Sequence, residues 1–117
     1  MVDWKKKLDA LYPKLSQNAR CALCGKKAEH QHHIIPRAND LLRYDVKNLL
    51  PLCHDCHSLV HDKNLNLSFF IPTARWLYLE QMSRIQFQDY LLGHGLTRDE
   101  FFKQKEKELK EIINARK

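Results

Sequence analysis

Apolar residues near the start of the chain recur at the spacing of one helical face. The apolar positions are spaced by four, three, one and three residues, with lysines on the other side: Trp4, Leu8, Leu11, Tyr12 and Leu15. This pattern predicts an amphipathic helix that covers a core with its apolar face and turns its lysines to solvent. Because proline lacks a backbone N–H, Pro13 is expected to end or kink this helix, which we place up to about Leu11.

The pattern changes in the middle of the chain. His30–Ile35 is predicted to be a short strand that Pro36 stops, because proline offers no N–H to a neighbouring strand. Residues 37–47 are polar and predict a loop, and Asn48–Leu52 predicts a second extended segment. From His54 to about Asp62 the spacing becomes helical. The sequence therefore predicts two short strands followed by a helix.

The second half of the chain is predicted to be helical. One helix is expected to begin near Thr73, as a possible N-cap, and to continue to about Leu92, where the Gly93–Gly95 segment breaks it. Thr97 and Glu100 have the spacing of a capping box before a last helix. Aromatic residues at helical spacing in this half are expected in the core, with a dimer face or a DNA contact as the alternatives: Trp76, Tyr78, Phe87 and Tyr90.

Composition limits the class of protein. The 117 residues fit a single domain, with an N-terminal helix (1–20), a core (21–65) and a helical extension (66–117). Apolar runs are too short to cross a bilayer, and the N-terminus does not resemble a signal peptide, so we expect a cytoplasmic protein. The net charge of +6 favours a polyanionic partner, since neutralised phosphates release condensed counterions.

The four cysteines form two Cys-x-x-Cys pairs. Cys21 and Cys24 make the first pair, and Cys53 and Cys56 make the second. In a reducing compartment such pairs indicate a metal site rather than disulfides, and four thiolates suit a structural Zn²⁺. Because the segment between the pairs is longer than in common zinc ribbons, we expect further structure inside the loop that zinc closes.

Histidines gather around the same segment. His57 and His61 are one helical turn apart, so both can reach one ion, and His32 can supply a third imidazole. Such a site keeps an open position, as a catalytic metal requires. His33 would then be free to act as a general base, with its ring held by the amide or carbonyl of Asn48. The alternative is a purely structural finger-like site, which leaves His33 and Asn48 without a role.

These motifs resemble the HNH endonucleases, the family with a ββα-metal core. The matching segments are the His-His-Ile-Ile-Pro run, Asn-Leu-Leu-Pro-Leu-Cys, and Cys-x-x-Cys-His-x-x-x-His. The spacing of His33, Asn48 and His57 is similar to that of the colicin DNases, and the cysteine pairs resemble the zinc-binding branch found in phage and restriction enzymes. The resemblance covers roughly residues 20–62. It implies an α+β fold, with a ββα-metal core and a four-cysteine zinc flanked by an N-terminal helix and C-terminal α-helices.

The resemblance also implies roles for individual residues. His33 would activate water, Asn48 would orient His33, and the metal held by His32, His57 and His61 would stabilise the phosphate and the leaving 3′-oxygen. The products would be 5′-phosphate and 3′-hydroxyl ends. A glycine-rich loop often follows the first histidines in the family, but here the chain reads Arg37-Ala-Asn-Asp-Leu. Arg37 is therefore expected either to clamp a phosphate oxygen or to form a surface ion pair.

Three functions remain open at this point. The first is cleavage of double-stranded DNA with Mg²⁺, Mn²⁺, Ni²⁺ or Zn²⁺ in the catalytic site, by a phage-encoded or restriction-like enzyme that could form a homodimer through its C-terminal helices. The second is a non-catalytic, zinc-stapled module that binds nucleic acid. The third is a zinc-stapled adaptor whose helices bind another protein. Only the first requires the imidazole of His33.

Overall fold

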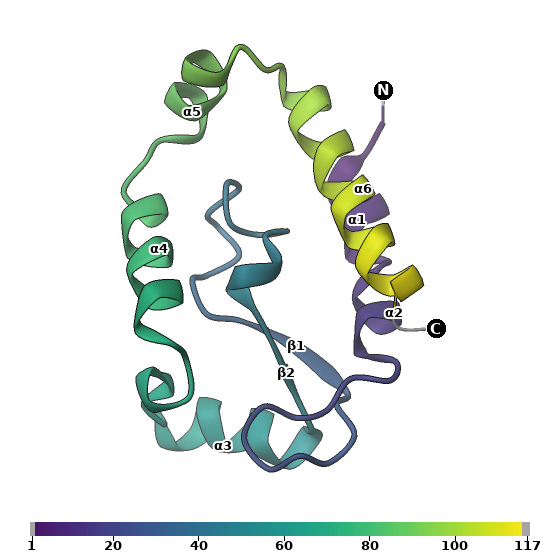
Figure 1. Cartoon of the computed structure of the whole chain (residues 1–117), viewed down its shortest axis with the longest axis vertical. Helices are drawn as coiled ribbons and strands as arrows, with labels where there is room; N and C mark the ends of the chain where they lie inside the picture. Colours follow the sequence, from purple (N-terminus) through teal and green to yellow (C-terminus); the bar gives the residue numbers. More distant parts are fainter. Residues whose placement is uncertain (1, 116–117) are drawn as a thin grey trace.

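The computed structural model describes residues 2–115, apart from the side chain of Ser68. Its helices are α1 (Trp4–Asp9), α2 (Tyr12–Ser16), α3 (His54–Lys63), α4 (Thr73–Ser83), α5 (Phe87–His94) and α6 (Arg98–Ala115). Its strands are β1 (His30–His33) and β2 (Leu49–Leu52), and single 3-10 turns span Val46–Asn48 (η1) and Leu67–Phe69 (η2). The helices surround a central two-stranded sheet (Figure 1). The predicted α+β class, with a ββα unit at its centre, is confirmed.

The two strands pair antiparallel and are joined by a long loop. His30 lies opposite Leu52, and His33 lies opposite Leu49. The leucines of β2 are buried, whereas every residue of β1 is half-buried. The sheet therefore fixes β2 against the interior and leaves the histidine-rich strand partly open to solvent.

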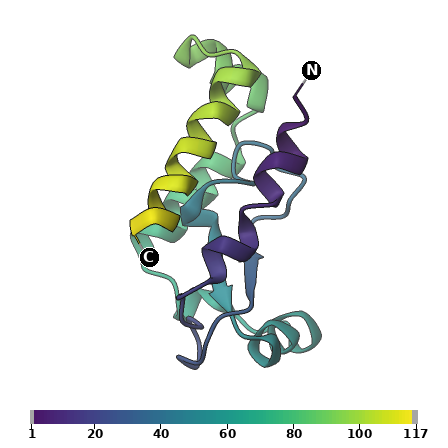
Figure 2. The ribbon, with the colours of Figure 1, turned by 90° about the vertical axis from the view of Figure 1, so that its right-hand side faces the viewer.

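Both ends of the chain contribute to one hydrophobic core. Leu8 from α1 and Leu15 from α2 pack in the same buried cluster as Phe102 and Leu109 from α6. The indole N–H of Trp4 donates a hydrogen bond to Asp99 across 2.9 Å. Figure 2 shows α6 running alongside the two N-terminal helices. The first and last helices thus hold each other in place, and the central sheet packs between them and α4.

Two predicted helix boundaries differ from the structure. The N-terminal helix is split into α1 and α2, and Pro13 sits in the first turn of α2, where its missing N–H needs no partner. The helix expected to reach Leu92 ends at Ser83, and Pro72 rather than Thr73 occupies its N-cap position. The chain turns after Ser83 because Phe87 then packs against Phe101 of α6, with ring centroids 5.1 Å apart.

The start of α6 agrees with its prediction. The Thr97 hydroxyl accepts from the backbone N–H of Glu100, and the Glu100 carboxylate accepts from the backbone N–H of Thr97, both at 3.1 Å. This reciprocal pair confirms the capping box. Gly95, with φ of +64°, ends α5 in the left-handed region that glycine adopts at no steric cost.

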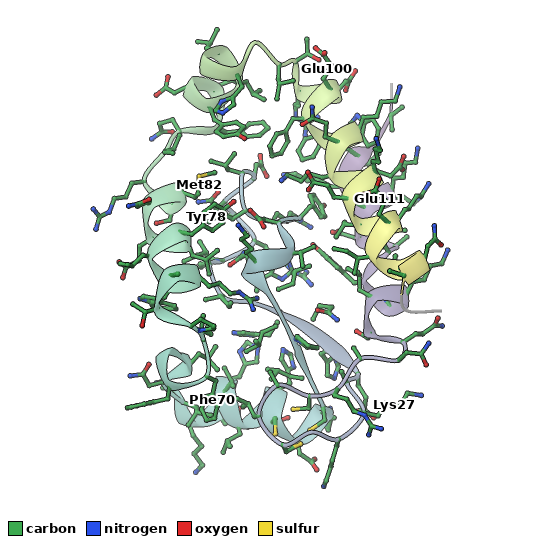
Figure 3. The ribbon with its side chains drawn as sticks, viewed as in Figure 1. Lys27, Phe70, Tyr78, Met82, Glu100 and Glu111 are labelled. Carbon is green, nitrogen blue, oxygen red and sulfur yellow. The ribbon has the colours of Figure 1, made fainter. Side chains whose placement is uncertain are left out.

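Helix α4 anchors the turn that leads into β2. The Arg75 guanidinium donates to the carbonyl of Lys47 at 2.6 Å and to that of Leu49 at 2.7 Å. Tyr78, on the inner side of α4 in Figure 3, donates to the carboxylate of Asp45. These bonds hold both sides of Asn48, so the helical second half supports the predicted site directly. None of the helices in residues 2–115 has the length and apolarity needed to cross a membrane.

Candidate active site and metal centres

The four cysteines come together where β2 ends and α3 begins. The sulfur atoms of Cys21, Cys24, Cys53 and Cys56 all lie within 4.8 Å of one another. Figure 3 shows a group of sulfur atoms, in yellow, beside α3. The Sγ atoms of Cys24 and Cys53 are 3.6 Å apart, close to the edge of about 3.8 Å expected for a tetrahedron with Zn–S bonds of about 2.3 Å. The cysteines are therefore positioned to bind one metal ion.

The backbone around the cysteines favours a thiolate. Burial alone would raise the pKa of the Cys21 thiol, but backbone hydrogen bonds from Cys53, Cys24 and Leu23 lower this pKa to about 6. Gly25 adopts a φ of +79°, which lets the chain curl back after the first pair, and its N–H donates to the carbonyl of Cys21 at 2.9 Å. Since thiolates are the metal-binding form, the Cys21 sulfur is prepared for a cation, whereas burial and the neighbouring thiols raise the pKa of Cys56.

Three imidazoles form a second group beside the sheet. One ring nitrogen from each of His32, His57 and His61 lies within 4.8 Å of the others. His32 comes from β1, whereas His57 and His61 come from successive turns of α3, so the ββα arrangement itself assembles the set. The Nε2 atoms of His57 and His61 are 3.1 Å apart, a spacing that two ligands of one ion with Zn–N bonds of about 2.0–2.1 Å can adopt.

Burial and neighbouring histidines keep His32 and His57 neutral, as metal ligation requires. Burial, followed by the charges that His57 and His61 would carry, lowers the pKa of His32 to about 4. The pKa of His57 is also lowered, first by burial and then by its histidine neighbours. A set of three imidazoles offers nitrogen lone pairs and fits a divalent transition metal.

His33 is held by groups from two other segments. Its Nε2 lies 3.1 Å from the Arg43 carbonyl oxygen and 3.0 Å from the Tyr12 hydroxyl, and that hydroxyl itself donates to the same carbonyl at 2.9 Å. Since a carbonyl only accepts, these partners assign the proton to Nε2, and Nδ1 then carries the lone pair. Burial lowers the pKa of His33, so the ring is neutral at neutral pH.

Asn48 has partners other than the His33 ring that we expected it to hold. Its side chain is fully buried, accepts from the N–H of Ile35 at 2.6 Å, and donates to the carbonyls of Ile35 and Leu42 at 3.0 and 3.1 Å. Asn48 therefore ties together the two ends of the loop between the strands. The carbonyl of Arg43, which follows Leu42 in the same loop, takes the place expected for Asn48 at the ring.

Replacing Asn48 by alanine should destabilise the protein by about 2–4 kcal/mol, because it leaves the buried carbonyl of Leu42 and the partly buried N–H and carbonyl of Ile35 without their partner. Urea unfolding measures this loss. Asn114→Ala makes the same substitution on the exposed face of α6 and should leave the unfolding midpoint nearly unchanged. Equal midpoints for the two variants would contradict the role of Asn48 as a tie across the loop.

Tyr12 is a positioning residue for His33 that sequence reasoning missed. Tyr12→Phe removes the hydrogen bond between the Tyr12 hydroxyl and His33, worth about 1 kcal/mol, so a reaction that uses His33 should slow about fivefold. The ¹⁵N chemical shifts of the His33 ring should also show a smaller share of the Nε2–H tautomer. Tyr90→Phe removes a hydroxyl from α5 and serves as the control. An unaltered tautomer ratio in Tyr12→Phe would rule out the positioning role.

An open cavity of about 670 Å³ joins these groups. His32, His33, His57 and His61 line it together with Arg37 and Tyr12. Arg37 is exposed, and within residues 2–115 no carboxylate lies at ion-pair distance from its guanidinium. Of the two roles expected for Arg37, the surface ion pair is therefore not formed.

Several residues at the site had no signal in the sequence. Arg43 contributes a backbone carbonyl, which every residue type has, so no residue pattern could have identified it. Tyr12 lies on a helix whose apolar spacing is explained by the core alone. Only the contact between α2 and β1, which the tertiary structure creates, brings Tyr12 to His33.

Comparison with known proteins agrees with this geometry. A search of curated proteins and a search of solved structures each found no match. The family model described as HNH endonuclease matches residues 21–63, a range that contains both metal-binding groups, His33 and Asn48. This match supports a nuclease-type function, and it ends before α4, α5 and α6. Residues 21–63 of this chain therefore match the HNH endonuclease family, and the four-cysteine group is consistent with the zinc-binding branch of that family.

Proposed function

We propose that the protein is a metal-dependent endonuclease that hydrolyses phosphodiester bonds of double-stranded DNA. The observation that carries this proposal is that His33 and a three-imidazole group line one open cavity. A purely structural metal site would not need a neutral, oriented histidine beside an open metal position. The cavity gives a phosphate room to approach both groups from solvent.

His33 acts as the general base. Its neutral ring takes a proton from a water molecule through Nδ1, while Nε2–H stays bonded to the Arg43 carbonyl and the Tyr12 hydroxyl. The water oxygen forms a bond to phosphorus as the bond from phosphorus to the 3′-oxygen breaks. The products are a 5′-phosphate and a 3′-hydroxyl, the latter after protonation by solvent.

The remaining site residues hold the reacting groups. His32, His57 and His61 would bind the catalytic ion, Mg²⁺, Mn²⁺, Ni²⁺ or Zn²⁺, which supplies charge stabilisation to the phosphate and the leaving oxygen when bound. Asn48 fixes the loop that presents the Arg43 carbonyl. Arg37, without a carboxylate partner, would contact a non-bridging phosphate oxygen. The ion at the four cysteines is proposed to be structural Zn²⁺, in a cytoplasm that keeps the thiols reduced.

DNA as the substrate is supported by the net charge of +6. For cleavage of both strands we propose a homodimer through the C-terminal helices. Large apolar side chains are exposed there, with Leu77 of α4 at 50% and Leu92 of α5 at 80% of their full exposure. Sedimentation of the purified chain, alone and with duplex DNA, measures this association.

Cleavage of supercoiled plasmid tests the proposal. The zinc-loaded protein is incubated with Mg²⁺, Mn²⁺, Ni²⁺ or Zn²⁺, and with EDTA followed by excess metal. Metal-dependent conversion to relaxed or linear DNA, abolished by EDTA and restored by metal, is the expected result. A protein that keeps its zinc and retains DNA in a gel shift, yet cleaves with none of these metals, would instead be the non-catalytic binding module.

A further inference from the structure

A third group of possible metal ligands lies outside the two already described. One ligand atom from each of Glu29, His30 and His54 lies within 4.8 Å of the others. Glu29 directly precedes β1, His30 is the first residue of β1, and His54 is the first residue of α3. The three come from segments that the pairing of β1 with β2 brings to the same end of the sheet.

Hydrogen bonds hold this group in place. The Glu29 N–H donates to the carbonyl of Leu52 at 2.9 Å, and the Glu29 carboxylate accepts from the backbone N–H of His54, also at 2.9 Å. The carboxylate is thereby fixed beside the first residue of α3 while it keeps lone pairs for another partner. The ring of His30 stacks on that of His57 at 4.6 Å between centroids, which limits how it can turn.

We propose that Glu29, His30 and His54 bind a divalent transition metal ion, which we call the outer site. Two imidazoles and one carboxylate suit Zn²⁺, Ni²⁺, Co²⁺ or Fe²⁺ better than Mg²⁺ or Ca²⁺, which prefer oxygen ligands alone. Glu29 and His54 are exposed, so an ion reaches the site directly from solvent. Three protein ligands leave further coordination positions open to water or to an anion.

The outer site adjoins the cavity of the proposed nuclease. Glu29 and His30 line the same cavity as His57 and His61. An ion bound there would add positive charge along the surface where a phosphate backbone would lie, and it would hold His30 against His57. The ligands of the outer site include none of the residues assigned to the other two groups, so its occupancy can be measured whether or not the protein cleaves DNA.

Equilibrium dialysis of the full chain against Ni²⁺ tests the proposal. Elemental analysis checks in every sample that zinc still occupies the cysteines. The wild type should bind two nickel ions, His54→Ala one, His61→Ala one, and the double variant none. Glu29→Gln keeps an acceptor for the His54 N–H but lacks the charge. The nickel affinity of this variant, measured in the His61→Ala background, should fall at least about tenfold. Even substitutions of residues that only support a metal ligand reduce metal affinity by about 10- to 100-fold.

His94→Ala is the matched control. His94 is an exposed histidine on α5, bonded through Nδ1 to the Tyr90 carbonyl at 2.9 Å, and it belongs to none of the ligand groups. This variant should bind as much nickel as the wild type. The outer site is refuted if His54→Ala and Glu29→Gln, with unchanged zinc content and circular dichroism, bind nickel in the same amount and with the same affinity as their parents. It is equally refuted if His61→Ala binds none.

Discussion

His33→Ala should reduce the rate of plasmid cleavage by about 10²- to 10⁴-fold, the contribution typical of a positioned general base. The imidazole is neutral because burial lowers its pKa, and its Nε2 is occupied by the Arg43 carbonyl and the Tyr12 hydroxyl. Alanine supplies no group that could take the proton in its place. The rate of loss of supercoiled plasmid at saturating metal measures this effect.

The same variant should keep its metals and its affinity for DNA. His33 belongs to none of the ligand groups in residues 2–115, so elemental analysis should give the wild-type metal content. His94→Ala, which removes an exposed imidazole on α5, should cleave like the wild type. Cleavage by His33→Ala at close to the wild-type rate, with the metals in place, would remove His33 from the mechanism and leave the general base unassigned.

Loss of the ion at the cysteines should unfold the segment that carries the active site. The apolar cluster around this group is small, with Leu50, Leu52 and Val60 as its buried aliphatic members, so a metal ion bound at the cysteines is expected to supply much of its stability. Structural zinc contributes apparent free energies of about 10–16 kcal/mol in zinc-finger peptides, comparable to the 5–15 kcal/mol stability of a whole domain. Chelation should therefore abolish hydrogen-exchange protection in β1, β2 and α3.

Cys53→Ser removes a metal ligand and keeps the second role of this side chain, the capping of α3. The Cys53 sulfur also caps α3, accepting from the N–H of Cys56 at 3.5 Å, and serine is a good N-cap residue. The variant should lose both zinc and the hydrogen-exchange protection of β1, β2 and α3. A chelator should then have no further effect on its exchange rates. Retained protection in β1 and α3 after complete loss of the metal would show that the apolar contacts suffice.

Much of the chemistry could be predicted because it depends on short spacings. Two residues between paired cysteines, and one helical turn between His57 and His61, place ligands on one side of a turn or helix whatever surrounds them. The capping box at Thr97 and Glu100 is local in the same way, since both of its hydrogen bonds lie within one turn. Such features need only the local backbone, and the sequence specifies that backbone directly.

Helix boundaries in the second half were less predictable. The apolar spacing of α4 continues to Ile85, yet Ile85 is 39% exposed and lies outside the helix. The chain turns there, and Phe87 and Leu91 of α5 pack in one cluster with Phe101 of α6. Packing between distant segments overrides local propensity at such positions.

The sequence by itself determined the ligand types, their pairing and the strand–strand–helix order that brings them together. The tertiary structure alone decided that Tyr12 and the Arg43 carbonyl orient His33, that Asn48 ties the loop instead, and that Glu29 meets His54. Each of these contacts joins residues from different segments, and three of them use backbone groups, which carry no residue-specific signal. Their positions depend on how α2, the loop and α3 pack around the sheet, and that packing is a property of the whole fold.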